Sequence, residues 1–346
     1  MMKTIRRWLA LALAVSMGLG LLTLPAAADA DPRGGELELL SYNVHGLPIF
    51  WEDYNPWEDS QLISAFFRDS GYDFIGVQED FNCHAEIAGA IEGAYPYQTV
   101  HQGVVPVGDG LGVFSKTQIY NQRNVPWEQT FGVFSDGSDE LTPKGFVHVL
   151  ARLEAPGAYV HIYVLHADAV YGDAGSLAAR ADNYRQLAAD IAQYPGEPLL
   201  VMGDFNGYYG EIEPFLTETS LRDTSLELYS AGHGDSIDHI LARDGMGVSF
   251  VTLESKNLWI QTAPGGVIAA EYLAEGARDL SDHAAKYAKL AWTYEGPENG
   301  VWGVEGSVTQ TPQWSIELLW RQVETFFAKL RLLLLESFRL LREQVV

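Results

Sequence analysis

The segment Leu199–Gly207 places the strictest constraint on how this chain can fold. Its apolar run, Leu199–Met202, follows Pro198 and stops at Gly-Asp-Phe-Asn-Gly, which indicates a buried strand that ends in a turn. Asp204 and Asn206 then leave the carboxyl end of the strand on the same side, because strand side chains alternate. Open α/β sheets bind ligands at this end. Read alone, the segment is equally compatible with an ordinary turn, where Asp, Asn and Gly are common.

Other apolar runs along the chain end in the same kinds of polar group. These groups are Asn43, Glu79, His166, Asp238 and the pair Asp282-His283. Each has an ordinary alternative: an asparagine caps turns, a carboxylate is solvated, a histidine is more often structural than catalytic, and Asp238-His239 could be a surface pair on an edge strand. Their shared position at strand ends instead favours a single site that hydrolyses phosphodiesters.

The residue types suit metal-assisted hydrolysis. Glu79 supplies a hard oxygen ligand for Mg²⁺, helped by the amide of Asn43. Such an ion neutralises a phosphate oxygen and the charge that develops on the leaving group. A histidine takes a proton from the attacking water, and a carboxylate behind it fixes its tautomer. Mn²⁺ and Ca²⁺ are alternatives, whereas zinc is disfavoured because carboxylates and amides dominate the set and Cys83, the only cysteine, lies outside it.

Hydrophobic periodicity predicts strands and helices in an α/β order. Strands are expected at 36–43, 73–78, 111–115, 119–125, 145–154, 159–166, 199–202, 236–241, 248–253 and 284–292, and helices at 57–69, 84–92 and 176–194. In the last helix the expected apolar stripe comprises Leu177, Ala181, Tyr184, Leu187, Ala188 and Ile191, with Arg180, Arg185 and Asp190 outside it. This order favours two sheets packed face to face with helices outside them.

The two ends of the chain predict export and an appended helix. Basic residues, an apolar run over 8–24 and an Ala-x-Ala site indicate a signal peptide over 1–30, with an uncleaved anchor as the alternative, so the protein is expected to be secreted. A catalytic domain over 31–295 and a linker over 296–312 follow. Residues 313–346 predict an amphipathic helix too rich in charge to span a membrane. Its broad apolar face suits self-association, a protein groove or a membrane surface.

The formal net charge of −24 bears on the substrate. Binding to nucleic acids normally depends on Lys and Arg side chains that neutralise phosphates. An acidic chain gains little affinity from that effect, although an acidic net charge is compatible with a local basic groove. The composition therefore disfavours a nucleic-acid substrate without excluding one.

Seven short segments of the chain, taken together, resemble the motifs of a known superfamily. Ser-Tyr-Asn-Val-His-Gly-Leu-Pro, Gly-Val-Gln-Glu-Asp, Asp-Gly-Leu-Gly-Val-Phe-Ser-Lys, His-Ala-Asp-Ala, Met-Gly-Asp-Phe-Asn-Gly, Ser-Ile-Asp-His-Ile and Leu-Ser-Asp-His occur in the order found in the endonuclease/exonuclease/phosphatase superfamily, over residues 37–292. The resemblance implies a four-layer α/β/β/α sandwich of two mixed sheets and metal-dependent cleavage of phosphoester bonds. Within it, the chain looks most similar to secreted and neutral sphingomyelinases of the C type.

The resemblance also implies a role for each site residue. Glu79 is the principal metal ligand, Asn43 contacts the metal or the phosphate, and Asp282 supports the metal side. His283 is the general base oriented by Asp238, while Asp204 positions the water, Asn206 holds the phosphoryl group and His166 stabilises the transition state. Lys144, in a Lys-Gly element of that branch, is expected to contact phosphate or head group, with an exposed lysine of no special role as the alternative.

These observations leave several functions open. The leading hypothesis is a secreted hydrolase of the phospholipase C type that acts on a phospholipid head group. An extracellular nuclease and a phosphoinositide-type phosphatase would use the same site. From a different class, an inactive binding module would use the helix over 313–346 to join a partner. Two departures from the sphingomyelinase pattern, Ala284-Ala285 after the last motif and His239 after Asp238, concern only the branch and remove no catalytic group.

Overall fold

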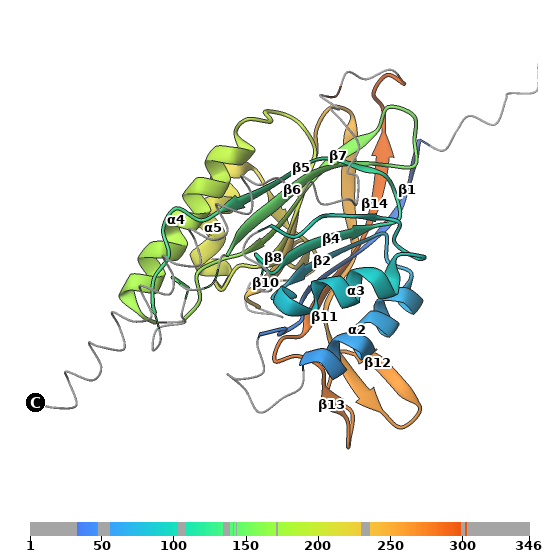
Figure 1. Cartoon of the computed structure of the whole chain (residues 1–346). Helices are drawn as coiled ribbons and strands as arrows, with labels where there is room; N and C mark the ends of the chain where they lie inside the picture. The colour runs from blue at the N-terminus through green and yellow to red at the C-terminus, as the bar shows by residue number, and fades with distance from the viewer. Residues whose placement is uncertain are drawn as a thin grey trace, which may run out of the picture.

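The structure, a computed structural model, describes residues 33–47, 56–102, 108–133, 139–140, 142, 144–170, 172–229, 236–298 and 302. The predicted signal peptide, the predicted C-terminal helix and most of the predicted linker lie outside the described residues. Two sheets form the centre of the described part (Figure 1).

The first sheet has the strand order β12-β11-β14-β1-β2-β4-β3, with β13 paired to β11. Its strands are β1 (Gly34–Asn43), β2 (Phe74–Gln78), β3 (Tyr97–Gln98), β4 (Leu111–Ser115), β11 (Val248–Ala263), β12 (Gly266–Ala270), β13 (Arg278–Asp279) and β14 (Ala285–Tyr294). Only β1 and β2 pair in parallel among the described strands of this sheet.

The second sheet has the order β5-β6-β7-β8-β10-β9. Its strands are β5 (Ile119–Pro126), β6 (Gly145–Arg152), β7 (Tyr159–His166), β8 (Leu199–Asp204), β9 (Arg222–Asp223) and β10 (Asp238–Arg243). Here β7 and β8 run parallel, while β10 runs antiparallel to β8. Both sheets are therefore mixed, as the sequence predicted.

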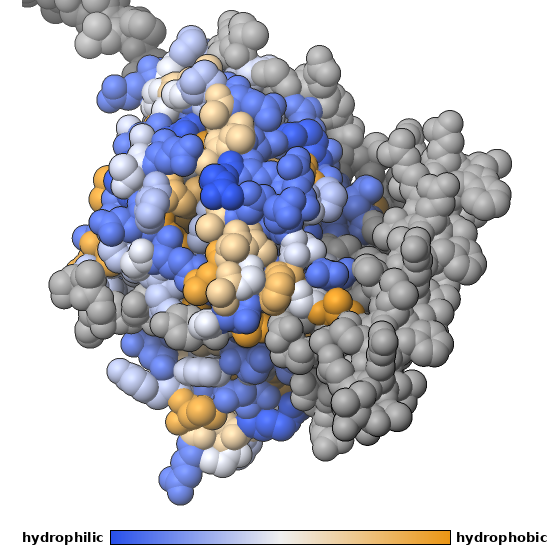
Figure 2. Space-filling view, turned by 90° about the vertical axis from the view of Figure 1, so that its left-hand side faces the viewer, coloured by the Kyte–Doolittle hydropathy of each residue, from blue (hydrophilic) through white to orange (hydrophobic). Residues whose placement is uncertain are grey.

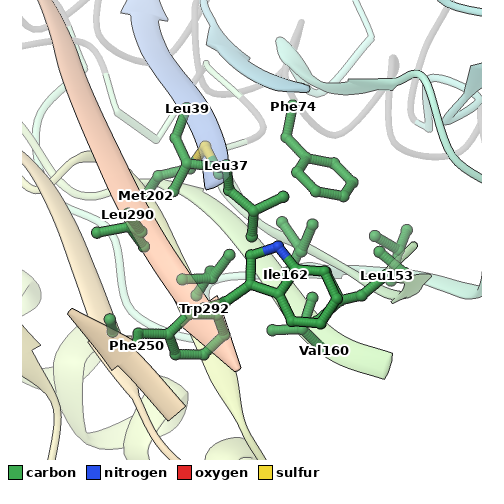
Figure 3. Packing of buried hydrophobic residues seen from close by; sticks show 14 of the residues in the cluster. Leu37, Leu39, Phe74, Leu153, Val160, Ile162, Met202, Phe250, Leu290 and Trp292 are labelled. Carbon is green, nitrogen blue, oxygen red and sulfur yellow. The ribbon is translucent and has the colours of Figure 1, made fainter. Parts of the chain in front are cut away.

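Alternation along the strands divides the apolar side chains between two environments. In β1, Leu37 and Leu39 face the second sheet, whereas Leu40 and Tyr42 pack with the helices outside the first sheet. The core between the sheets is shown in Figure 3, which labels Leu37, Leu39, Phe74, Leu153, Val160, Ile162, Met202, Phe250, Leu290 and Trp292. Because the period is two, the residues at 41 and 43 must also face the space between the sheets.

Helices cover the outer face of each sheet and complete the four layers (Figure 1). The first sheet packs against α2 (Pro56–Ser70) and α3 (His84–Ile91), and α3 follows the short helix η2 (Phe81–Cys83). The second sheet packs against α4 (Ala174–Ile191) and α5 (Tyr209–Thr219), and the short α6 (Thr224–Leu228) lies against β11. The predicted α/β/β/α sandwich is confirmed.

The buried face of α4 differs from the predicted apolar stripe. Leu177 is 38% exposed and Ala181 is also exposed, so both assignments to the stripe were wrong, and so was the placement of Arg180 and Asp190 outside it. Arg180 is fully buried and pairs with Glu211 of α5. Asp190 is buried because it accepts hydrogen bonds from Arg123 and from the Tyr163 hydroxyl. A hydropathy pattern does not reveal such a buried face, because the residues of a buried ion pair are as hydrophilic as those on the surface.

Arg180 also anchors the segment that follows β7. Its guanidinium donates to the Glu211 carboxylate at 2.6 Å and to the carbonyl oxygens of Asp168 and Ala169 at 3.0 and 3.1 Å. We expect Arg180→Met to lower the free energy of unfolding by about 3 kcal/mol, because removal of one partner leaves a carboxylate and buried carbonyls unpaired. Urea denaturation measures the loss. Arg185→Met on the same helix is the control, because its side chain is exposed and its loss should cost about 0.5 kcal/mol or less; equal losses would contradict the prediction.

Most of the elements that the sequence did not predict lie after residue 204. Helix α5 contains Pro214 and begins at Tyr209-Gly210, so propensity argues against it, yet Ile212 and Phe215 are buried under it. Strand β11 was predicted to end at 253, but it continues after a register shift and forms a hairpin with β12 through Gly265 and Gly266, whose φ values are positive. Strands β3, β9, β12 and β13 and helix α6 are also short or polar.

Packing continues beyond residue 295, where the linker was predicted to begin. The Tyr294 hydroxyl donates to the Pro297 carbonyl oxygen at 2.7 Å, and the Trp302 indole donates to the Gly157 carbonyl oxygen at 2.8 Å. Trp302 is buried and its ring lies 5.6 Å from that of Tyr159. These residues therefore belong structurally to the sandwich.

The surface of the described part is mainly polar on the face seen in Figure 2, with apolar side chains in smaller groups. Among the described helices, none combines the length and apolar character needed to cross a bilayer.

Candidate active site

The predicted site residues meet where strands of both sheets end. His166, Asp204 and Asp238 lie at one register across β7, β8 and β10, because Asp204 is the partner of both other residues. Each shares its strand face with apolar residues of the core between the sheets, so its side chain faces that space. Asn43 faces it from the end of β1, and Glu79 follows β2, the parallel neighbour of β1.

Asn43 lies between two carboxylates. Its side-chain amide donates to Glu79 Oε1 at 3.0 Å and to Asp204 Oδ2 at 3.2 Å, while its Oδ1 accepts from the backbone N–H of His45. The amide therefore fixes the separation of a residue from the first sheet and one from the second. The predicted contact of Asn43 with metal or phosphate stays a prediction.

His283 forms a hydrogen-bonded pair with Asp238. Its Nδ1 lies 2.8 Å from Asp238 Oδ2, and its Nε2 lies 3.7 Å from Asp204 Oδ2. Burial alone would lower the pKa of His283, but the carboxylates of Asp238 and Asp204 outweigh it and raise that pKa to about 10. Burial, and then the charge of Asp238, raise the pKa of Asp204 to about 7. This pairing is the arrangement of a general base held by a carboxylate.

His166 is buried opposite His283. Its Nε2 lies 3.4 Å from Asp204 Oδ2 and 3.7 Å from Glu79 Oε1. Burial lowers the pKa of His166 well below its ordinary value, and the positive charges of Lys144 and His283 add to that effect. His166 is therefore a neutral imidazole near neutral pH, able to donate a hydrogen bond to a substrate oxygen.

Lys144 and Asn206 both contact the backbone next to His166. Lys144 is buried rather than exposed, so the alternative of an ordinary surface lysine was wrong; its ammonium pairs with Asp139 at 2.5 Å and lies 3.4 Å from the Ala167 carbonyl oxygen. Asn206 donates to the same carbonyl oxygen at 3.1 Å. Burial alone would lower the pKa of Lys144, but Asp139 and Glu79 raise it, so it stays a cation.

Asp282 lies at the rim of the site. Its side chain is 61% exposed, and its Oδ1 lies 3.5 Å from His45 Nδ1 and 3.4 Å from the hydroxyl oxygen of Ser281. The proposed role on the metal side stays a prediction. Ser281 is a residue that the sequence reasoning missed: its hydroxyl donates to the Asn43 carbonyl oxygen at 2.7 Å and accepts from the His283 N–H, which ties the last loop to β1.

Three residues of this site have a left-handed backbone conformation. His45, Glu79 and Asn206 have φ values of +51°, +58° and +51°, a region that costs a residue with a side chain on the order of 1 kcal/mol. Gly46 is required beside them, because a Cβ there would lie 2.5 Å from the Glu79 carbonyl oxygen. The sequence predicted no separate role for His45 and Gly46, and the motif Asn-Val-His-Gly was the signal that could have identified them.

The donor set fits a divalent cation at Glu79. Glu79 Oε2 is buried and has no hydrogen-bond partner, while Oε1 is held by Asn43. A buried carboxylate oxygen without a partner is costly in a protein and is the hard ligand that Mg²⁺ prefers. Asp204, Asp238 and His283 also place their ligand atoms within 4.8 Å of one another.

Known structures share this fold. Sphingomyelinase C from Streptomyces griseocarneus has a similar structure, with a TM-score of 0.53 and 22% identity over 74% of this chain and 99% of that chain. D. rerio TDP2 complexed with a single-strand DNA product gives a TM-score of 0.56 and 13% identity over 74% and 99%. Beta toxin from Staphylococcus aureus with bound magnesium ions gives 0.53 and 18% over 73% and 99%. No curated protein matches the sequence.

At such identities these structures support the fold and do not decide the substrate. Residues 40–283 match the Endonuclease/Exonuclease/phosphatase family over most of the chain. With this match and the convergent polar site, the chain is a phosphoric ester hydrolase. It belongs to the Endonuclease/Exonuclease/phosphatase family.

Proposed function

We propose that this protein is a secreted, Mg²⁺-dependent phosphodiesterase of the phospholipase C type that acts on sphingomyelin-like lipids. The observation that carries the hydrolytic part is the convergence of His283–Asp238, Asp204, His166 and Glu79 at the ends of strands from both sheets. The sphingomyelinase structure among the similar proteins supports the substrate class, and the magnesium-bound beta toxin supports the metal.

In this proposal Asp238 fixes the tautomer of His283. The carboxylate accepts a hydrogen bond from Nδ1–H, which leaves Nε2 as the nitrogen that takes a proton from water. Asp204, 3.7 Å from that nitrogen, orients the same water. His166 and Asn206 lie on the side of the phosphoryl oxygens, where hydrogen bonds to developing negative charge stabilise the transition state.

Glu79 would hold the divalent cation, with Asn43 orienting its carboxylate. When bound, the cation supplies charge neutralisation for a phosphoryl oxygen and the leaving group. The positive charge also opposes the field of Asp204 and Asp238, so we expect the pKa of His283 in the working enzyme to fall below its metal-free value. Lys144 adds a second fixed positive charge behind His166.

The net charge of −24 favours a lipid over a nucleic acid, because polyphosphate binding draws on excess basic residues. The predicted signal peptide supports export. The predicted helix over 313–346 would contact a membrane surface or a second copy of the chain.

A substrate panel tests the proposal. Purified full chain is incubated with Mg²⁺ or with chelator and offered sphingomyelin vesicles, phosphatidylcholine vesicles, a phosphoinositide and plasmid DNA. We expect Mg²⁺-dependent release of phosphocholine from sphingomyelin. Nicking of DNA with the lipids left intact would support the nuclease instead, and release of inorganic phosphate alone would support the phosphatase. If the Glu79→Ala/His283→Ala variant keeps the activities of the wild type, catalysis at this site is contradicted.

A further inference from the structure

A second cluster of metal-ligating side chains lies next to Glu79 along the chain but points elsewhere. Asp80 precedes η2, His84 begins α3, and His101 lies in the loop after β3. Asp80 Oδ2 lies 2.6 Å from His84 Nδ1, and Asp80 Oδ1 lies 2.7 Å from His101 Nε2. One ligand atom of each residue lies within 4.8 Å of the other two, so the turn at 80–84 and the loop at 101 bring two nitrogens and a carboxylate together.

The surroundings are shaped around this cluster. The two imidazole rings are stacked with centroids 4.0 Å apart and planes 10° apart. Gly108, with φ of +65°, leaves room for His101, since a Cβ there would lie 2.2 Å from His101 Nδ1. Gly112 lies nearby, where an added Cβ would be 2.9 Å from Val77 and 3.3 Å from Asp80 Oδ2. Gly108 therefore leaves the space that the His101 imidazole occupies.

The cluster is both anchored in the core and accessible from solvent. The Asp80 side chain is fully buried, whereas the side chains of His84 and His101 are 13% and 16% exposed. His84 also lines an open pocket of about 260 Å³ between α3 and the segment at 98–100. Both imidazoles are therefore partly open to solvent, while the Asp80 carboxylate is held in the core below them.

The local charge favours a cation. Asp109 brings a second carboxylate to His101, with Oδ1 3.5 Å from Nε2, and Asn124 holds Asp109 by donating to its Oδ2 at 2.6 Å. Two carboxylates therefore lie against the same ring nitrogen of His101, and a divalent ion would supply positive charge to both.

We propose that Asp80, His84 and His101 form a zinc-class metal site, separate from the Glu79 site, with a fourth coordination position open to solvent. Imidazole nitrogens with one carboxylate are the ligands of Zn²⁺ and related divalent ions, whereas Mg²⁺ takes oxygen ligands and is expected at Glu79. The bound ion fixes the turn in which Glu79 has its positive φ. Zinc binding itself does not depend on the proposed phosphodiesterase activity.

Zinc stoichiometry tests the proposal on the full chain. Metal-stripped protein is equilibrated with ZnCl₂ in excess Mg²⁺, separated from free ions by gel filtration and analysed for bound zinc. We expect one zinc per chain in the wild type and in Glu79→Gln, and none in His84→Ala/His101→Ala. Glu86→Gln, an exposed carboxylate on α3, is the control for surface binding and should keep the zinc. Zinc should also raise the thermal midpoint of the wild type by a few degrees, on the order of 3 °C.

Other outcomes separate the two sites and the two proposals. Equal zinc in the wild type and the double histidine variant, or zinc lost from Glu79→Gln alone, would place the ion elsewhere and overturn the proposal. If the double variant is misfolded by circular dichroism, Asp80→Asn, which keeps the size of the side chain, replaces it with the same expected loss. A wild type that retains zinc but cleaves no phosphodiester would contradict the proposed function and leave this site standing.

Discussion

Replacement of His283 by asparagine is expected to lower kcat/KM for phosphodiester hydrolysis by about 10⁴-fold, the upper end of what a positioned general base contributes. The reason is geometric: each ring nitrogen of His283 faces a carboxylate, with Nδ1 2.8 Å from Asp238 and Nε2 3.7 Å from Asp204. Initial rates on the substrate found by the panel measure the loss. A fall of less than tenfold, in a variant with unchanged thermal midpoint, would exclude His283 as the base.

The pH profile separates this role from a structural one. Asp238 stabilises the imidazolium of His283, so its negative charge raises the pKa of that histidine. Asp238→Asn removes the charge and lowers the pKa of His283, so the basic form is populated at lower pH. We therefore expect the acid limb of log kcat/KM to move to lower pH in Asp238→Asn, while the maximum rate falls because the tautomer is no longer fixed. An unmoved acid limb would mean that another group titrates there.

Glu79→Gln is expected to lower kcat/KM by about 10³-fold, which corresponds to about 4 kcal/mol of lost transition-state stabilisation. Glutamine keeps the size of the side chain and a partner for Asn43, but it removes the negative charge from a buried position whose Oε2 has no hydrogen-bond partner. The concentration of Mg²⁺ needed for half-maximal rate should rise as well. Steady-state rates over a Mg²⁺ series measure both effects.

Stability gives an independent check on Glu79. Glu79 Oε2 is buried without a hydrogen-bond partner, and a glutamine would still offer an oxygen to the amide of Asn43. We expect Glu79→Gln to be as stable as the wild type, or more stable, without metal, and to gain less on addition of Mg²⁺. The exposed Glu86→Gln variant should match the wild type in both measurements. A metal-free destabilisation of Glu79→Gln would point to a structural role instead.

The period of the strands explains how much of the site could be predicted. Val201 faces the outer helices whereas Leu200 and Met202 face the other sheet, so Asp204 had to face it too. The same parity places His166 and Asp238 there. A buried strand that stops at a polar residue thus gives both the position and the direction of the side chain. The register between strands, however, depends on how the strands pair, so it cannot be predicted from any single segment.

The failures have a different physical origin. Arg180 and Lys144 read as surface residues because their charges are costly to bury. The partners that compensate that cost are brought to them by the fold: Glu211 and carbonyl oxygens for Arg180, and Asp139 and the Ala167 carbonyl oxygen for Lys144. The β11 hairpin was missed because its stability depends on pairing with β12 and β14 rather than on an apolar pattern.

The sequence by itself determined the class of fold, the set of polar groups at the strand ends and the phosphoester chemistry that those groups suit. Local patterns carry this information, since period, turn residues and side-chain type are properties of short segments. Tertiary structure alone decided that Asn43 bridges Glu79 and Asp204, that Lys144 is buried, and that Asp80, His84 and His101 meet. A contact such as that of Asn43 with Asp204 joins segments far apart in the chain, and its free energy exists only once both sheets have packed.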